Sequence, residues 1–352
     1  MVNSTETRKT GLFVFMLLML ISGTCVTITV KFMDMLKVNG KSFNHPYFQT
    51  FSMFIGEFMC LIVYFSLKFL SRPRNNSQLT ESLIEKPNRS GSLAWLTIPA
   101  IFDICGSTSI LIGLSFSTPS VYQMLKGFLL VIVALYSVIF LKASLNLNQV
   151  LGISINFVGT VIIGIVSVAY KAPSAENPLL GIFFIMLGEL FSGGFVVSEE
   201  MIFKKIKVNP LLAVGIEGSI GCLVYIIALP ILYLIPCDYE GICNNGRVED
   251  AYTAILGLLS NNTLALIWIC SMVSVAVFNW SGISTTQKSS ALTRAIIDAS
   301  RSLSVWLVSM ILHWEEFLPL QLLGFLLIML GTIIYNSSVN WLKKNKETCT
   351  IS

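Results

Sequence analysis

The chain has 352 residues, of which 54% are hydrophobic and only 12% are charged. A soluble domain carries about 25% charged residues, so the composition excludes an ordinary soluble domain and predicts a polytopic membrane protein. The net charge of +4 is small and gives no reason to expect a nucleic-acid partner.

Ten apolar runs approach the length of about 20 residues that a helix needs to cross a bilayer. The first is too long for the apolar core of a signal peptide and lacks a small-residue cleavage site, so we expect it to remain as a span. We therefore predict an all-α protein with ten transmembrane helices. The runs lie at 11–31, 46–69, 93–115, 118–141, 150–170, 179–203, 211–235, 263–286, 291–312 and 318–339.

The distribution of positive charge predicts the orientation. If the N-terminus is cytoplasmic, the connections on the inner side hold fifteen Lys and Arg residues and those on the outer side hold five. Because membrane proteins place Lys and Arg in their cytoplasmic loops, both termini are predicted to be cytoplasmic.

An internal repeat supports the same arrangement. Shifts of 170 and 172 residues superpose small and polar residues of the first five runs on those of the last five, in order. Because each half holds an odd number of spans, the halves must be inverted relative to one another, as in many secondary transporters. The matched pairs include Ser22/Ser192, Gly23/Gly193, Gln149/Gln321, Gly152/Gly324 and Gly159/Gly331. The predicted organisation is a cytoplasmic N-terminus at 1–10, a first five-helix repeat at 11–171 with a flexible cytoplasmic loop at 71–92, a second repeat at 179–339 with a lumenal loop at 236–262, and a cytoplasmic tail at 340–352.

The lumenal loop is acidic and contains Cys237 and Cys243. Their spacing could close a small disulfide ring if the loop faces an oxidising compartment, and the sequence alone leaves this bond open. A short helix at the membrane surface is expected at 251–259. With no CxxC pair and only two histidines, neither a metal site nor a cofactor is expected.

The ninth apolar run contains three charged residues, Arg294, Asp298 and Arg301. At about 100° per residue they share one face of a helix, and charges at membrane depth almost always face a protein interior or a water-filled cavity. The shift of 172 residues places Lys126 on Asp298 and Tyr122 on Arg294. The fourth and ninth helices are therefore predicted to be symmetry mates around a polar centre.

These residues predict a solute site. Three cations beside one carboxylate would leave positive charge in excess, which suits an anionic or zwitterionic solute. The alternative is a buried structural network that touches no solute. The predicted substrate-binding residues are Lys126, Arg294, Asp298, Arg301, Tyr122, Gln123 and Asn279.

Other carboxylates embedded in the apolar runs are candidates for proton coupling, because ionisable groups inside a membrane often relay protons. The alternative is that they balance the cations or lie at helix ends. Glu199 and Glu200 are instead expected to form salt bridges with Lys204 and Lys205 at the membrane surface. The proton-coupling candidates are Glu57, Asp103, Glu189 and Glu217.

No phosphate-binding Gly-rich loop, HExxH motif or nucleophile elbow occurs in the sequence, so the chain is not expected to be an enzyme. Five segments together resemble the drug/metabolite transporter superfamily, and within it the member-six branch of the F-type solute carrier 35 proteins. The chloroquine-resistance transporters are similar but more distant. The segments are HPYFQTFSMFIGEF at 45–58, PAIFDICGSTS at 99–109, SVYQMLKG at 120–127, VNPLLAVGIEGSIG at 208–221 and FNWSGISTTQKSSALTRAIIDASRS at 278–302.

The resemblance implies ten helices around a central cavity, with the helix pairs 3–4 and 8–9 acting as gates. Nucleotide-sugar carriers of the superfamily often show a Gly-Ala-Leu-Asn-Lys motif in helix 9, whereas residues 290–294 here read Ser-Ala-Leu-Thr-Arg. The resemblance therefore does not favour a nucleotide sugar as the solute.

We predict a secondary-active transporter of a small anionic or zwitterionic organic solute, working by alternating access. A nucleotide-sugar exchanger and a membrane interaction protein that does not transport are the alternatives. The predicted location is an endomembrane, either the lysosome or vacuole or the Golgi, with the plasma membrane and mitochondrion as open alternatives. Protons as co-substrates and a homodimer are also left open.

Overall fold

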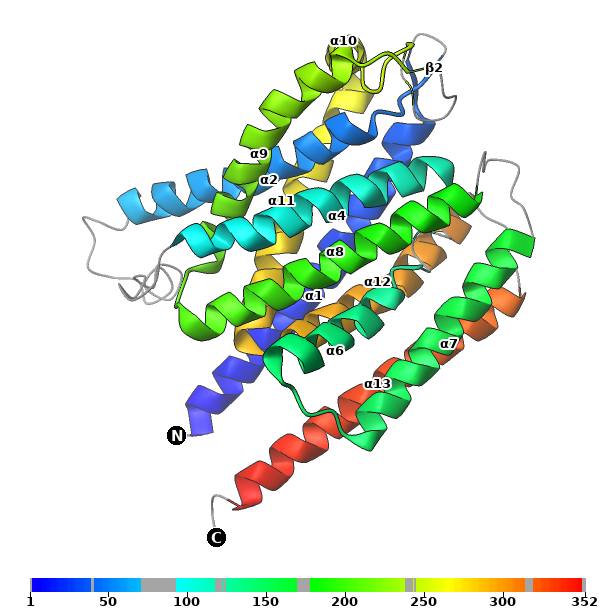
Figure 1. The fold of residues 1–352 in the computed structure, drawn as a ribbon. Helices are drawn as coiled ribbons and strands as arrows, with labels where there is room; N and C mark the ends of the chain where they lie inside the picture. The colour runs from blue at the N-terminus through cyan, green and yellow to red at the C-terminus, as the bar shows by residue number, and fades with distance from the viewer. Residues whose placement is uncertain are drawn as a thin grey trace.

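The computed structural model describes residues 2–38, 41–70, 93–117, 122, 125–169, 178–237, 243, 245–313 and 319–349. Within these ranges the chain is a bundle of helices with one small β-hairpin (Figure 1). The predicted cytoplasmic loop at 71–92 and the predicted solute residue Gln123 lie outside the described residues.

The helices follow the predicted apolar runs closely, and several continue into the polar flanks. In the first half the elements are α1 (Val2–Met35), β1 (Lys37–Val38), β2 (Lys41–Ser42), α2 (Pro46–Leu70), the short 3-10 helix η1 (Leu93–Leu96), α4 (Thr97–Phe116), α6 (Phe128–Leu141) and α7 (Leu147–Ala169). In the second half they are α8 (Pro178–Lys205), α9 (Pro210–Leu234), α10 (Ala251–Ser260), α11 (Asn262–Lys288), α12 (Ala291–Ile311) and α13 (Pro319–Cys349). β1 and β2 pair antiparallel, with Lys37 opposite Ser42.

Side chains that cap helix ends explain three of these boundaries. The Ser290 side chain accepts a hydrogen bond from the backbone N–H of Thr293 at the start of α12. At the start of α11, the Asn261 side chain accepts one from the backbone N–H of Thr263. Asn209 caps α9, whose first residue is a proline. Proline is favoured there because its missing N–H has no partner at a helix start in any case.

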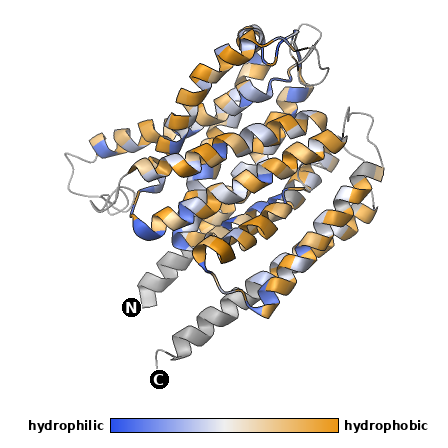
Figure 2. Cartoon of the chain, in the orientation of Figure 1, coloured by the Kyte–Doolittle hydropathy of each residue, from blue (hydrophilic) through white to orange (hydrophobic). Residues whose placement is uncertain are grey.

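The surface of the bundle is that of a membrane protein. Among the described residues, seven helical segments are long and apolar enough to span a bilayer, namely Gly11–Met35, Pro46–Leu70, Leu93–Phe116, Leu147–Val166, Leu179–Lys205, Pro210–Leu234 and Asn262–Lys288. Large apolar side chains such as Leu223 and Ile227 are exposed, while Arg301 and Glu217 are buried. Hydrophobic residues predominate along most of the helices (Figure 2). Apolar exteriors around buried charges are stable in lipid and not in water.

Four helix pairs make the most extensive contacts: α7 with α13, α4 with α8, α1 with α11, and α2 with α9. α7 and α13 lie side by side at one edge of the bundle, and α6 and α12 lie between them and α8 (Figure 1). Glycines permit this close approach, since a Cβ on Gly331 would lie only 2.5 Å from the carbonyl oxygen of Gly152.

The fourth apolar run departs from the prediction. It was expected to be one continuous helix over 118–141, but α6 begins only at Phe128 and is preceded by a turn at Lys126 and Gly127. The backbone N–H of Leu129 bonds back to the carbonyl of Lys126 at 3.1 Å, which is the tighter spacing of a 3-10 turn. Lys126 therefore lies at a helix interruption, a place where transporters often bind their solutes.

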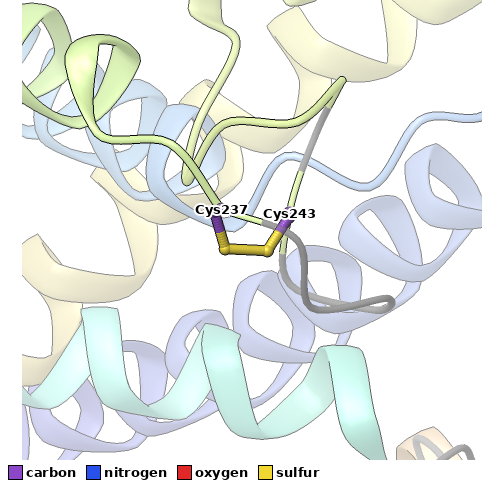
Figure 3. Close-up of a disulfide and its surroundings, with 2 residues drawn as sticks. All are labelled: Cys237 and Cys243. Carbon is purple, nitrogen blue, oxygen red and sulfur yellow. A yellow bond between two sulfur atoms is a disulfide. The ribbon is translucent and has the colours of Figure 1, made fainter.

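The connection between α9 and α11 contains a disulfide and a short helix. The structure joins Cys237 and Cys243 by a disulfide (Figure 3), and α10 occupies the position where a short helix was predicted. Asp250 caps α10. Burial by itself raises the pKa of Asp250, but hydrogen bonds from Asn245 and Thr253 outweigh this effect and hold the pKa below its usual value.

Candidate functional site

A cavity of about 110 Å³ lies among α1, α2, α4, α6, α8, α11 and α12. It extends from Arg294, at the start of α12, toward Val30 and Leu114 near the ends of α1 and α4. Apolar walls with a few convergent polar groups are typical of solute sites. The polar side chains that line this cavity are those of Thr27, Asp103, Ser107, Tyr122, Lys126, Glu189, Ser192, Asn279, Arg294, Asp298 and Arg301.

Arg301 is the most enclosed cation of the cavity, with 2% of its surface exposed. Its Nη2 lies 3.1 Å from Oδ1 of Asp298, and its Nη1 donates to the carbonyl oxygen of Gly23 at 3.1 Å. The guanidinium also lies over the ring of Phe278, 4.9 Å from the centroid. These contacts fix Arg301 between α1, α11 and α12.

Lys126 has a different environment. Its Nζ lies over the ring of Tyr122, 5.1 Å from the centroid, and it forms no ion pair with any carboxylate in the described part of the chain. A cation–π contact leaves the donors of the ammonium group free for other partners. Lys126 is thus a cation of the cavity that is available to a solute.

Glu189 is an acidic residue of the cavity whose carboxylate, like the ammonium group of Lys126, lacks an ion-pair partner in the described part of the chain. It comes from α8, lines the same cavity and is almost fully buried. Within the described ranges, no hydrogen-bond donor reaches either of its carboxylate oxygens. A buried acceptor without a donor costs free energy, so this carboxylate is suited to receive a proton or a cationic group of a solute.

Arg294 is paired, which the sequence did not predict. Its Nη1 forms an ion pair and hydrogen bond with Oε2 of Glu199 on α8, and its guanidinium lies 5.0 Å from the ring centroid of Phe195. The expectation that Glu199 forms a salt bridge at the membrane surface is therefore wrong, because Glu199 is completely buried. The predicted salt bridge of Glu200 is confirmed, because its carboxylate lies 2.7 Å from Nζ of Lys204.

The remaining predicted carboxylates fall into two groups. Asp103 lines the cavity and accepts a hydrogen bond from Ser107 at 2.9 Å. Glu57 and Glu217 are buried but do not line it. Asn279, which was predicted to face the cavity, does so and donates to Glu57 at 2.5 Å.

The predicted excess of positive charge does not hold. That prediction set three cations against Asp298 alone, but Asp103 and Glu189 line the cavity as well, and Glu199 neutralises Arg294. The cavity therefore presents charges of both signs. Within the described ranges, no three His, Cys, Asp or Glu side chains are placed so that they could hold a metal ion.

Sequence reasoning missed Glu199, Phe195 and Phe278. One signal could have found the first of these: Glu199 follows Ser192 by seven residues and Phe195 by four, so all three share one helix face. The aromatic residues carried no signal, because phenylalanine is common throughout the apolar runs.

Comparison with known proteins identifies the family. The family model described as Solute carrier family 35 (SLC35F) matches residues 7–337. The chain belongs to this family. Solute carrier family 35 member F6 of Rattus norvegicus is 33% identical over 328 residues, which cover 91% of this chain and 87% of that protein. The Homo sapiens protein of the same name is 32% identical over the same coverage.

An uncharacterized protein of Schizosaccharomyces pombe is 30% identical over 333 residues, covering 92% of this chain and 97% of its own length. One solved crystal structure, 12% identical, superposes with a TM-score of 0.58 over 95% of this chain and 99% of its own. At that identity the likeness shows the fold alone. Membership of this solute carrier family confirms the predicted resemblance and points to a transporter of small solutes rather than an enzyme.

Proposed function

We propose that the chain is a secondary-active transporter that moves a small zwitterionic or anionic organic solute by alternating access. The observation that carries the proposal is the pair of free groups in the cavity: the ammonium of Lys126 has no carboxylate partner and the carboxylate of Glu189 has no donor, among the residues described. An anionic group of the solute would bind Lys126, and an ammonium group would bind Glu189.

The proposed architecture is ten spans in two inverted repeats of five. The contacts between helices support it, because exchanging the two halves maps the most extensive contacts onto one another. α4 packs on α8 as α11 packs on α1, and α6 packs on α8 as α12 packs on α1. Repeats of this kind allow a solute site to be exposed to each side of the membrane in turn.

The proposed orientation puts both termini in the cytoplasm. Both chain ends emerge at the same end of the bundle (Figure 1). α8 and α11 end at Lys205 and Lys288, which are cations of the kind retained on the cytoplasmic side. The disulfide-containing loop then faces the other side, where an oxidising lumen would preserve it. This supports an endomembrane location.

Transport by proteoliposomes containing the purified protein tests the proposal. With a panel of labelled amino acids, organic anions and nucleotide sugars, we expect saturable uptake of a zwitterion or an anion. Lys126→Met should reduce that uptake by about 10- to 100-fold, since a hydrogen bond to a charged group contributes about 1.5–3 kcal/mol. The matched control is Lys68→Met, because Lys68 also lies over a tyrosine ring, that of Tyr64, but outside the cavity.

Normal uptake by Lys126→Met would contradict the assignment of the site. If uptake occurs only when the vesicles are preloaded with a nucleotide, the chain is a nucleotide-sugar exchanger instead. If no member of the panel is taken up and Lys126→Met only lowers the unfolding temperature, the charges are structural and the non-transporting alternative gains support.

A further inference from the structure

A second group of charges lies against the cavity at the lysine-bearing end of the bundle. Arg294 is its only described cation, and carboxylates from four helices surround it. Arg294 pairs with Glu199 of α8 and also interacts electrostatically with the other three carboxylates. We call these carboxylates the acid cluster: Glu57 on α2, Asp103 on α4, Glu199 on α8 and Glu217 on α9.

The acid cluster is almost sealed from solvent. Glu57, Glu199 and Glu217 are each at most 3% exposed, and Arg294 is 4% exposed. Asp103 lines the cavity, as does Arg294, so these two residues connect the cluster to the solute site. The cluster therefore adjoins the solute site and shares Asp103 with it.

The charges of the acid cluster do not balance without protons. Four carboxylates beside one guanidinium would leave three negative charges in a buried space, and like charges in contact cannot all be ionised there. Glu199 and Glu217 adjoin one another. One oxygen of each lacks a hydrogen-bond donor among the residues the structure describes. A proton shared by these two neighbouring carboxylates would supply a donor that they lack, which points to the proton as the missing ligand.

The other titratable groups around the acid cluster do not supply the positive charge that would balance its carboxylates. Cys60 on α2 and Cys222 on α9 interact with Glu57, and Tyr225 on α9 interacts with Asp103. All three are neutral when protonated. Lys126 interacts with Asp103 from the far side of the cavity, where it belongs to the solute site.

The pairing of Arg294 with Glu199 also joins α8 to α12 near one end of the bundle. Glu199 lies near the end of α8, and Arg294 lies in the first turns of α12. The next residue of α8, Glu200, accepts a hydrogen bond from the backbone N–H of Ala291 at 2.6 Å. These contacts hold α8 against α12 at the end that carries Lys204 and Lys205.

We propose that the acid cluster is a proton-binding gate, in which a proton taken up between Glu199 and Glu217 releases Arg294 and opens the cytoplasmic end of the cavity. An anionic group of the solute can then replace Glu199 at Arg294, because Arg294 already lines the cavity. The inference rests on the proposed transport function only where it couples proton binding to the transport of a solute. The gate itself can be tested without a solute.

Hydrogen–deuterium exchange of the full-length protein in detergent micelles tests the gate. The readout is the exchange of the first turns of α12 and the last turns of α8, corrected for the intrinsic rate at each pH. Between about pH 8 and about pH 5 we expect exchange there to rise by about 10-fold or more as the gate opens locally. Glu199→Gln, which cannot hold Arg294 by charge, should exchange fast at both pH values.

Glu217→Gln should keep the ion pair of Glu199 with Arg294 but lose the site for the shared proton, so its exchange should stay slow at both pH values. The matched control is Asp34→Asn, a carboxylate of α1 near the opposite end that accepts from Gln49 at 2.7 Å and should behave like the wild type. Equal exchange at both pH values in the wild type, with Glu199→Gln unchanged, would overturn the inference.

Flux measurements separate this inference from the proposed function. If uptake occurs but neither uptake nor exchange responds to pH, the transport function stands and the gate fails. If exchange responds to pH and to Glu199→Gln while no solute is transported, the proton-binding gate stands and the transport function fails.

Discussion

At the scale of single residues, Arg301 depends on the absence of a side chain at Gly23. A Cβ on Gly23 would lie 2.6 Å from both Cδ and Nη1 of Arg301 and 2.9 Å from the ring of Phe278. A flexible arginine could ordinarily move aside, but this one is fixed by Asp298, by the Gly23 carbonyl and by the ring below it. Gly23 is therefore a residue of the site although it has no functional group.

We expect Gly23→Ala to destabilise the protein by about 1–3 kcal/mol, the usual cost of overpacking a buried position, and to reduce transport by displacing Arg301. Unfolding by SDS titration in mixed micelles measures the first effect and proteoliposome uptake the second. Gly11→Ala on the same helix is the control, since a Cβ there would lie 3.7 Å from the nearest atom, Nζ of Lys288. Equal stability of the two variants would show that Arg301 is not held as the structure indicates.

At the scale of elements, α7 and α13 are held together by two symmetric glycine contacts. A Cβ on Gly331 would lie 2.5 Å from the carbonyl oxygen of Gly152, and one on Gly159 would lie 2.7 Å from that of Gly324. The repeat found in the sequence pairs Gly152 with Gly324 and Gly159 with Gly331, so it converts one contact into the other. This agreement is independent support for the proposed inverted repeat.

We expect Gly331→Ala and Gly159→Ala to destabilise the protein to a similar extent, about 1–3 kcal/mol each, because each Cβ meets backbone that cannot rotate away. SDS-titration unfolding measures both. Gly164→Ala, also on α7, should be nearly neutral, since its Cβ would meet only a side-chain carbon of Leu125 at 4.0 Å. A large effect of one substitution and none of the other would argue against the symmetry.

The same elements show how much could be predicted from sequence. α12 was predicted at 291–312 and found at Ala291–Ile311, because the length of an apolar run is a local signal. The turn before α6 was missed, since nothing local forbids a helix at Lys126. The ion pair of Arg294 with Glu199 was missed because it joins residues 95 positions apart, and its formation depends on how α8 and α12 pack.

At the scale of the whole molecule, the two ends of the bundle are closed differently. The lysine-bearing end is held by the acid cluster, which binds protons in our proposal. At the other end, Asp250 caps α10 with a carboxylate whose pKa is lowered. The pKa of Asp250 in the unfolded protein is about 3.9, and above that pH the ionised carboxylate contributes its full stabilisation to the folded state. That stabilisation is lost only as the pH falls through the lower pKa of the folded protein. This cap therefore stays charged in mildly acidic solution.

Glu249 joins the two halves of the chain at that same end. One of its carboxylate oxygens lies 2.6 Å from Nδ1 of His45, and the other accepts from the backbone N–H groups of Tyr47 and Phe48 at 3.1 and 3.3 Å. Glu249 lies in the connection that leads into α10, and it thus supplies the hydrogen-bond acceptor for backbone N–H groups at the start of α2. Glu249 is completely buried, so its partners have no water to replace it.

We expect Glu249→Ala to destabilise the folded protein by about 1–3 kcal/mol for each buried donor left without an acceptor, because the backbone N–H groups of Tyr47 and Phe48 would lose theirs. Glu249→Gln should cost less, because its amide oxygen can still accept from the start of α2. SDS-titration unfolding of these variants, of His45→Ala and of the double variant gives the coupling energy between the two side chains. A coupling energy near zero would mean that His45 and Glu249 contribute independently, and the junction between the halves would then rest on the capping of α2 alone.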